Sequence, residues 1–420
     1  MTAEVRQEFR AGAGVLFGST LAFGMGVSPL ILYTSGVFVA DLTGAIGLTR
    51  TQFGLGLLAV TLALGLSSPI VGWAIDRFGV RRPAVFSLLT LAGGFALMAT
   101  ATHSVTDYIV IQTLTALLAS ASGPVAYAKT VSAWFVRSRG LALGITLLGI
   151  GAAAAVLPSI IARVIAAHGW RSGYLTLSAI ALCGILPLIA LVRLPATTSA
   201  TPITIDTGGT SVSQALRTQT FWLLIGAVAV MALGITGLVS HFLPMLGDMG
   251  VDPLRAARVA GLIGVALIVS RIAVGALVDR IFAPWVAAGV CLISLSGCLV
   301  MSLAGRDVAA IGALAVGTAL GGEIDLIGFF AARYFGLQSF GRIYGFFYAA
   351  FILGAGFSPV WMGVLRDRTG SYAAALVGTI VLLALAAFLF LLLPRYPEHM
   401  AHVATLRVHA PDDGESVPRD

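Results

Sequence analysis

The chain has 420 residues, of which 58% are hydrophobic and 10% are charged, and its formal net charge is +7. Soluble domains are about 45–50% apolar and about 25% charged, so this composition excludes an ordinary soluble domain and indicates a helical protein that crosses a membrane repeatedly. The positive charge does not indicate a nucleic-acid partner, because the Arg residues are spread over many loops instead of forming one basic patch.

Twelve apolar runs are long enough to cross a bilayer, which takes about 20 helical residues. In chain order they lie at 11–40, 51–74, 82–101, 107–135, 141–166, 172–193, 219–245, 257–278, 284–304, 308–333, 342–364 and 371–394. A polar stretch interrupts the series after the sixth run. We therefore predict an all-α membrane protein with a six-helix bundle at 1–193, a cytoplasmic linker at 194–218, a second six-helix bundle at 219–395 and a cytoplasmic polar tail at 396–420.

The basic residues of the loops are distributed unevenly between the two sides of the membrane. Loops on the side of the chain ends hold 15 Arg, from Arg6 to Arg419, whereas loops on the other side hold seven, from Arg50 to Arg368. Because cytoplasmic loops carry the excess of basic residues, we predict a multi-pass protein of the plasma (inner) membrane with both termini in the cytoplasm.

The two halves of the chain repeat each other at an offset of about 200 residues. The pattern G-x-x-x-D-R occurs after the second run, from Gly72 to Arg77, and again after the eighth run, from Gly275 to Arg280. A longer match aligns 134–151 with 334–356. Duplicated six-helix halves are typical of transporters in which two bundles rock about a central site.

Two motifs resemble those of a known family. GWAIDRFGVRRP, which begins at Gly72, resembles the loop 2-3 signature of the major facilitator superfamily. The stretch from Trp134 to Gly144 resembles the span 5 motif of the monocarboxylate transporter family and its bacterial relatives, including oxalate/formate antiporters. The resemblance implies two pseudo-symmetric six-helix bundles. It also implies a conformational charge network at the cytoplasmic helix ends, formed by Asp76, Arg77, Arg81, Arg82, Asp279, Arg280 and Arg139.

Arg271 is the first candidate for substrate binding. It lies eight residues before Asp279, or roughly 12 Å into the membrane, and the first half has Ser68 at the equivalent position. Guanidinium groups bind carboxylates through two parallel hydrogen bonds, and the resemblance implies the same role, because the family's carboxylate anchor precedes the loop Gly by four residues. The alternative is a structural ion pair with an acid of the protein.

The acids at membrane depth are Glu323 and Asp325, which lie about as deep as Arg271. Two residues apart on a helix, they point in different directions, so at most one faces a central cavity. Either could carry a proton, since burial and a nearby cation tune a carboxyl group, or could form an ion pair that locks one state. His241, near the outer end of the seventh run, is a third candidate for proton coupling.

Lys129 is the only lysine of the chain and lies within an apolar helix. It is either a site residue, which binds substrate or pairs with an acid of span 10, or an anchor whose side chain reaches the membrane interface. Pro29 is expected to break the first span near Tyr33. Tyr33 and Tyr127 could then supply hydroxyl groups to the substrate pocket.

Among the functional classes, a secondary transporter explains the repeat and the isolated charges at membrane depth. The chain has no HExxH motif and no P-loop, so we predict neither an enzyme nor an ATP-driven pump, and we expect no cofactor and no metal. We predict transport of small organic anions, most of all monocarboxylates, by proton symport or anion exchange. The expected partners are a small carboxylate, a proton or counter-anion and the lipid bilayer, with a monomeric chain. The alternatives are a proton-coupled exporter of amphipathic or cationic compounds and a non-transporting sensor or scaffold.

Overall fold

The computed structural model describes residues 3–194 and 209–397, and these residues are almost entirely helical. Most of the predicted linker and nearly all of the predicted tail lie outside the described residues. The first half comprises α1 (Ala3–Gly24), α2 (Val27–Leu32), α3 (Val39–Ile46), α4 (Arg50–Phe78), α5 (Arg81–Ala101), α6 (Val105–Leu118), α7 (Pro124–Trp134), α8 (Arg139–His168), α9 (Trp170–Cys183) and α10 (Ile185–Leu191). The short α11 (Val212–Ala215) precedes the second half, which comprises α12 (Gln219–Asp248), α13 (Pro253–Val278), α14 (Ala283–Ala304), α15 (Ala309–Phe335), α16 (Phe340–Thr369) and α17 (Ala373–Leu391).

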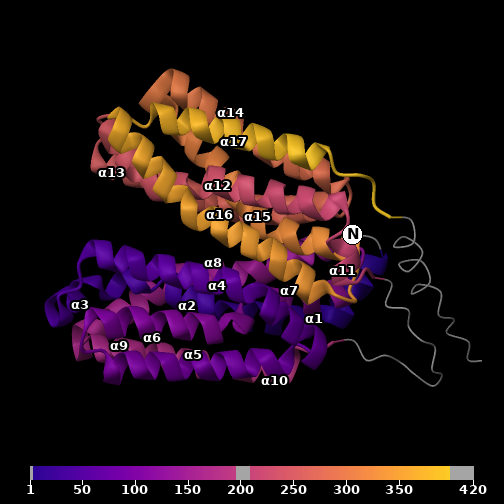
Figure 1. Ribbon diagram of the computed structural model, residues 1–420, viewed down its shortest axis with the longest axis horizontal. Coiled ribbons are helices and arrows are strands. Elements are labelled where there is room, and N and C mark those ends of the chain that lie inside the picture. Colours follow the sequence, from indigo (N-terminus) through magenta and orange to yellow (C-terminus); the bar gives the residue numbers. More distant parts are fainter. Residues whose placement is uncertain (1–2, 195–208, 398–420) are drawn as a thin grey trace, which may run out of the picture.

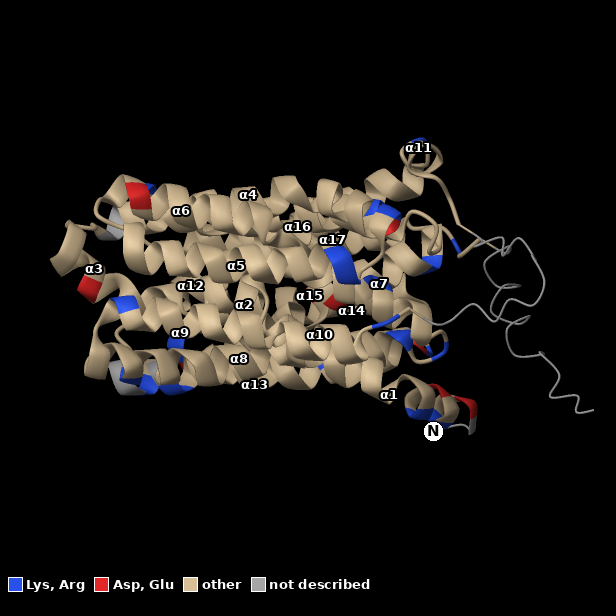
Figure 2. Ribbon diagram, turned by 90° about the horizontal axis from the view of Figure 1, so that it is seen from below, with Lys and Arg blue, Asp and Glu red and all other residues tan. Residues whose placement is uncertain are grey.

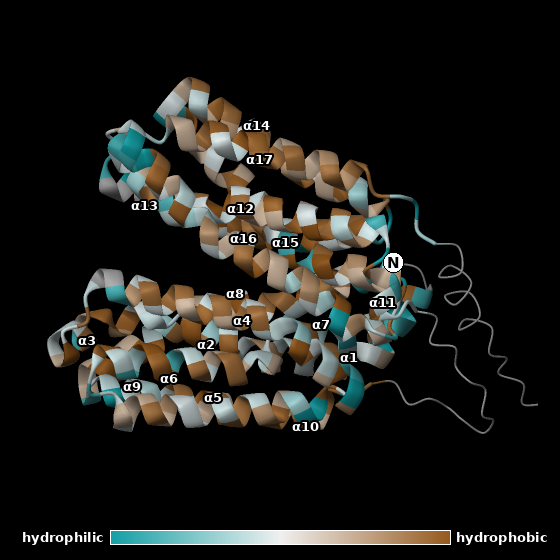
Figure 3. Cartoon of the chain, in the orientation of Figure 1, coloured by the Kyte–Doolittle hydropathy of each residue, from teal (hydrophilic) through white to brown (hydrophobic). Residues whose placement is uncertain are grey.

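The helices form two bundles that lie side by side, one from each half of the chain (Figure 1). We use "terminal end" for the end of the molecule at which α1 begins and α17 ends, and "opposite end" for the other. The bundles approach each other at the terminal end and diverge toward the opposite end (Figure 1). The helices are long apolar ribbons (Figure 3), and the charged residues gather near the two ends of the bundles (Figure 2). This is the pattern expected of helices that cross a bilayer.

By length and hydropathy, the described residues hold ten candidate membrane spans, or 11 if the bent pair α6 and α7 counts as one. One candidate, Ala283–Phe335, is 53 residues long and contains both α14 and α15. These are separate helices that pack against each other. Counting them separately adds one span, which agrees with the twelve-helix fold predicted from the sequence.

The first span differs from its prediction as a single helix over 11–40. Helix α1 begins earlier, at Ala3, and the chain breaks after Gly24 and resumes as α2 at Val27. The break lies one turn before Pro29, which has no N–H to donate to the carbonyl of Met25. At the break, the backbone N–H of Val27 is satisfied from the other broken span, because it donates to the Ser122 hydroxyl at 3.1 Å.

Glycines bring the two bundles together at the terminal end. A Cβ atom on Gly72 of α4 would lie 2.0 Å from the carbonyl oxygen of Gly341 on α16. A Cβ atom on Gly140 of α8 would lie 2.3 Å from the carbonyl oxygen of Gly275 on α13. Real Cβ atoms do not approach a backbone oxygen this closely, so only glycine permits the helices to pack at this distance.

Burial along α8 and α16 shows how far this contact extends. All but two of the buried residues of α8 lie between Arg139 and Ile150, and the exceptions are Ile161 and Ile165. All but two of the buried residues of α16 likewise lie at its beginning, before residue 353. The halves therefore meet over the terminal part of these helices and separate toward the opposite end.

Candidate functional site

Arg271 lies on α13 between the two halves of the molecule. Its side chain is 6% exposed, and its Nη1 donates to the carbonyl oxygen of Leu147 on α8, in the other half, at 2.9 Å. Its Nε donates to the carbonyl oxygen of Gly321 on α15 in a long hydrogen bond of 3.5 Å. The guanidinium group is thus a buried cation at the interface, held mainly by backbone oxygens.

Asp325 on α15 is the carboxylate beside this cation. The distance from Arg271 Nε to Asp325 Oδ2 is 3.8 Å, which is an ion pair but too long for a hydrogen bond. Neither carboxylate oxygen of Asp325 has a hydrogen-bond partner among the described residues. A guanidinium group has five N–H donors, so the pair leaves hydrogen-bonding capacity unused on both partners.

Glu323 is also buried, at 5% exposure, but it does not line the same space. It lies within electrostatic range of Cys291 on α14 and of Arg271, but only Asp325 of the two acids lines a cavity between the two halves. The sequence predicted that at most one of the two acids faces such a cavity, and in the structure that acid is Asp325.

The cavity lies where α1, α7, α8, α15 and α16 meet. Its walls are mostly apolar and include the rings of Phe23, Tyr127 and Tyr344, with Leu147 beside Arg271. The rings of Phe23 and Tyr127 are 5.3 Å apart between centroids. The Tyr127 hydroxyl is buried and has no hydrogen-bond partner among the described residues. The cavity thus combines aromatic walls with two phenols and one carboxylate.

Tyr33 follows α2 and is 49% exposed. It lies within electrostatic range of Arg271 and of Tyr348, which come from α13 and α16. Because both neighbours belong to the other half, the exposed face of Tyr33 opens on the space between the halves. Tyr127 lines the cavity and Tyr33 lies near Arg271, and their role in substrate binding stays a prediction.

Sequence reasoning missed the aromatic residues of α16. Tyr344 lines the cavity, and its ring stacks on that of Tyr348 at 6.1 Å between centroids. The spacing Tyr-x-x-x-Tyr puts both rings on one helix face, and this signal was present in the sequence. It could not be interpreted without knowing which face of α16 meets the first half.

Asp76 connects the halves at the terminal end. Its carboxylate accepts from the backbone N–H groups of Gly341 at 2.9 Å and Arg342 at 3.0 Å, in the first turn of α16. Its Oδ1 also accepts from Lys129 Nζ at 2.7 Å. A carboxylate at a helix N-terminus is stabilised by the free N–H groups and the helix dipole. Lys129 thus pairs with Asp76, and not with an acid of span 10 as one prediction had it.

Asp279 makes the equivalent contact from the second half. Its carboxylate accepts from the backbone N–H groups of Gly140 at 2.8 Å and Leu141 at 3.0 Å, in the first turn of α8. Burial raises the pKa of Asp279 to about 6, against these hydrogen bonds and the charges of Arg139 and Arg333, which lower it. We call the contacts of Asp76 and Asp279 together the terminal gate.

For four Arg residues of the predicted charge network, the structure records no contact with the other half. Arg77 lies over the rings of Trp73 and Phe78, at 5.9 and 5.8 Å from their centroids. Arg81 donates to the carbonyl of Val192 at 2.7 Å, within its own half, and Arg82 and Arg280 are exposed. The network between the halves is instead centred on the two aspartates, and Arg342, which sequence reasoning missed, lies 3.6 Å from Asp76.

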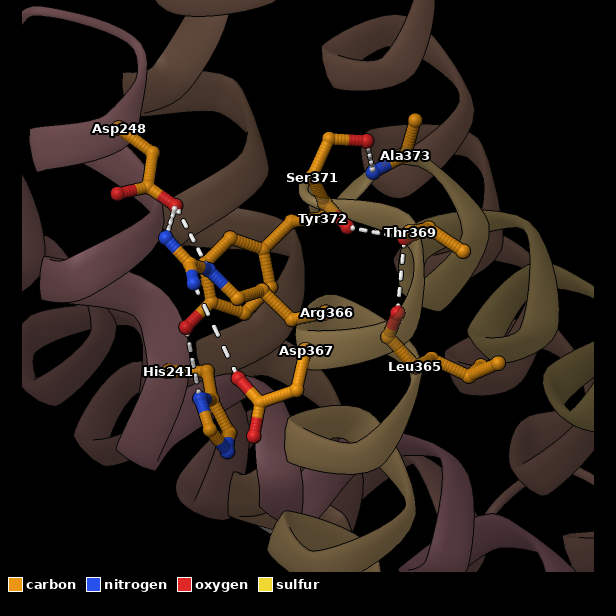
Figure 4. A network of polar contacts seen from close by, with 9 residues as sticks. All are labelled: His241, Asp248, Leu365, Arg366, Asp367, Thr369, Ser371, Tyr372 and Ala373. Carbon is orange, nitrogen blue, oxygen red and sulfur yellow. Dashed lines mark hydrogen bonds and ion pairs between the residues drawn. The ribbon is translucent and has the colours of Figure 1, made fainter.

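His241 lies toward the opposite end of α12, inside the second bundle (Figure 4). Its Nε2 donates to the carbonyl oxygen of Pro359 at 3.0 Å, so in the neutral ring Nδ1 accepts from the Tyr372 hydroxyl at 2.9 Å. Asp248 and Arg366 form an ion pair nearby at 3.2 Å (Figure 4). Both ring nitrogens of His241 are therefore used to join α12 to the α16–α17 region, and its role in proton coupling stays a prediction.

Within residues 3–194 and 209–397, no group of three or more His, Cys, Asp or Glu side chains is placed to hold a metal ion. The charged groups between the halves include the guanidinium group of Arg271 and the carboxylate of Asp325 at the centre, and Asp76, Lys129, Arg342 and Asp279 at the terminal gate. Such charged groups at the centre could bind a charged solute, and contacts at one end could open or close its access to that side of the membrane.

Comparison with known proteins identifies the family. The family model of the Major Facilitator Superfamily matches residues 21–335. Monocarboxylate transporter 13 of Bos taurus is 25% identical over 406 residues, which cover 90% of this chain and 88% of that protein. Riboflavin transporter RibJ of Trypanosoma cruzi is 32% identical over 139 residues, but the match covers only 29% of its length.

The solved structures show the same fold. A structure of FucP, a Major Facilitator Superfamily transporter in the outward conformation, superposes with a TM-score of 0.70 at 17% identity, covering 91% of this chain and 99% of FucP. The predicted resemblance to the superfamily and to its monocarboxylate transporters is thereby confirmed, as is the fold class. The chain belongs to the Major Facilitator Superfamily and is a membrane transporter.

Proposed function

We propose that this protein is a secondary active transporter of small organic anions, with monocarboxylates as the first choice, and that Arg271 binds the substrate carboxylate. The observation that carries the proposal is the state of Arg271, a cation buried between the halves whose ion-pair partner Asp325 stands 3.8 Å away. A substrate carboxylate can supply the paired, charge-assisted hydrogen bonds that Asp325 does not make. The similarity to Monocarboxylate transporter 13 supports the same substrate class.

Asp325 provides a route for coupling to protons. When its carboxylate is ionised, it holds the guanidinium group of Arg271 and competes with the substrate. When it is protonated, the competition ends and the cation is available to the substrate carboxylate. One proton would then accompany each carboxylate, whereas exchange of one carboxylate for another needs no net proton movement. The proposal thus includes symport and exchange at one site.

The orientation follows from the distribution of Arg. We propose that the terminal end faces the cytoplasm, because its loops carry the excess of basic residues. The closed terminal gate then corresponds to an outward-facing state. The protein would reside in the plasma (inner) membrane.

The test compares two acids of the same helix in proteoliposomes. Asp325→Asn should abolish uptake driven by an imposed pH gradient while preserving exchange of labelled for unlabelled carboxylate. Glu323→Gln is the matched control, because Glu323 is equally buried but does not line the cavity, and it should retain both activities. If Asp325→Asn still took up carboxylate at the wild-type rate under an imposed pH gradient, this coupling scheme would be excluded.

A second candidate is a proton-coupled exporter of cationic or amphipathic compounds. It is favoured by the position of Asp325 in a cavity with aromatic walls, since carboxylates and ring faces both attract cations. A thermal-shift panel of carboxylates and cationic compounds on the purified protein separates the two, because a ligand that binds the folded state raises its apparent stability. Stabilisation by cations alone would favour the exporter.

A further inference from the structure

The central space between the halves is lined by aromatic side chains of α16, α7 and α1 and by leucines of α8. On α16, Tyr344 and Tyr348 form a continuous stack, which Phe351 extends at 5.9 Å between centroids. On α8, the cavity is lined by Leu143 and Leu147. We propose that the substrate is an aromatic monocarboxylate, whose ring lies against α16 while its carboxylate binds Arg271; this inference rests on the proposed function.

The internal repeat shows that these rings are not required by the scaffold. Gly345 of α16 packs against the backbone of Ser68, and Gly144 of α8 packs against the backbone of Arg271, so the two glycines are equivalent. The residue before each glycine is Tyr344 in one half and Leu143 in the other. The residue three after each is Tyr348 and Leu147, respectively. The same helix contact is thus built with leucines in one half and with tyrosines in the other.

The rings lie close to the cation that would bind the carboxylate. Tyr33 and Tyr348, from opposite halves, are within electrostatic range of each other, and Tyr33 is also within range of Arg271. Tyr127 and Phe23 continue the aromatic lining from the first half. A substrate ring therefore meets ring faces on both sides of the space in which its carboxylate can reach Arg271.

The chemistry of such a site favours an aromatic acid over a short aliphatic one. Acids of two or three carbons satisfy the guanidinium group but leave the rings without contact. Ring-on-ring packing contributes about 1 kcal/mol beyond the burial of apolar area, which corresponds to about a fivefold change in affinity. A saturated ring of similar size is stabilised by the burial of apolar area but not by ring stacking.

The test measures competition against uptake of labelled benzoate in proteoliposomes. The competitors are benzoate, cyclohexanecarboxylate and acetate, which share the carboxylate and differ in the ring. Benzoate should compete at least about fivefold better than cyclohexanecarboxylate. Tyr344→Leu and Tyr348→Leu, which give α16 the residues of α8, should each reduce this preference by about fivefold and leave competition by acetate unchanged.

Two further variants keep the test interpretable. Tyr344→Phe retains the ring and should retain the preference. Phe347→Leu removes a ring on the same helix that packs on Phe221 and Phe335 inside the second bundle, so it should lower stability without changing the preference. Transport of acetate with no preference for benzoate over cyclohexanecarboxylate would overturn the inference but leave the proposed function intact. Failure to bind or transport any carboxylate would overturn both.

Discussion

Asp76 in the first half and Asp279 in the second occupy equivalent positions, and each accepts two backbone hydrogen bonds from the start of the helix that faces it in the other half. The equivalent residues at the centre are different. Arg271 in the second half corresponds to Ser68 in the first, and the tyrosines of α16 correspond to leucines of α8. Under the proposed function the comparison separates two tasks, in which the repeated contacts serve closure and the unrepeated residues serve the ligand.

The gate itself is symmetric in its backbone contacts but not in its side chains. Asp76 is paired with Lys129 at 2.7 Å. In the aligned segments 134–151 and 334–356, Trp134 matches Tyr334, so Lys129 corresponds to Phe329 and Asp279 has no equivalent lysine. One arm of the terminal gate is thus held by a salt bridge to Lys129, whereas the carboxylate of the other arm lies at a helix N-terminus within electrostatic range of Arg139 and Arg333.

The largest effect is expected from the glycines that both arms share. Gly72→Ala and Gly140→Ala each place a methyl group against a backbone oxygen of the other half, so closure of the terminal gate should be disfavoured by about 1–3 kcal/mol, or about 5- to 150-fold. Transport should fall accordingly in both variants. Gly93→Ala and Gly289→Ala, where an added Cβ meets nothing within 4 Å, are the controls. An unimpaired rate in either gate variant would contradict the close packing of that arm.

A smaller effect is expected from the arm with the salt bridge. Lys129→Met leaves the Asp76 carboxylate with its backbone donors and Arg342, so the closed state should lose about tenfold in population. Cysteine accessibility from the terminal end measures this opening. Lys129→Arg distinguishes the two interpretations of this residue, since an interface anchor accepts Arg and a compact site beside Asp76 does not. A wild-type transport rate in the Arg variant would make Lys129 an interface anchor.

The smallest effect is a pH dependence of the other arm. In the closed gate the pKa of Asp279 is raised by burial from 3.8 to about 6, and opening to water returns it to its ordinary range. A raised pKa means that the closed gate binds the proton more tightly. The stabilisation of the closed gate by this proton is therefore present in full at pH values below the ordinary pKa of 3.8, and it is lost as the pH rises through about 6. Between pH 7 and pH 5 the equilibrium should shift toward the closed gate by about ninefold.

Spin labels at Arg82→Cys and Arg280→Cys, one exposed position in each half, can report this change as a distance distribution. The background should replace Cys183, Cys291 and Cys298 by Ala, because these are free thiols. Asp279→Asn should flatten the response in this window. A response of the same size in Asp279→Asn would assign the titration to another group.

The sequence predicted the symmetric part of this comparison better than the asymmetric part. Hydropathy and the G-x-x-x-D-R repeat predicted the twelve helices and both aspartates, because these features depend on chain-local patterns. The partner of Lys129 was not predictable, since Asp76 lies 53 residues away and the contact depends on how α4 and α7 pack. The aromatic face of α16 was missed for the same reason.

The acids of α15 show what helical geometry alone can decide. Their spacing predicted that Glu323 and Asp325 point in different directions, but the choice of Asp325 depends on the position of α14 and of the first half. The break of the first span near Pro29 was expected, but its start after Gly24 depends on the hydrogen bond from Val27 to Ser122. Tertiary packing thus determines which of the predicted residues meet.

The central claim is that Arg271 binds the substrate carboxylate, and equilibrium binding of a labelled carboxylate to purified protein tests it most directly. Arg271→Lys keeps the positive charge but loses the paired hydrogen bonds, so affinity should fall about tenfold or more. Arg163→Lys, at an exposed position on α8, is the matched control and should bind like the wild type. Wild-type affinity in Arg271→Ala would contradict the account.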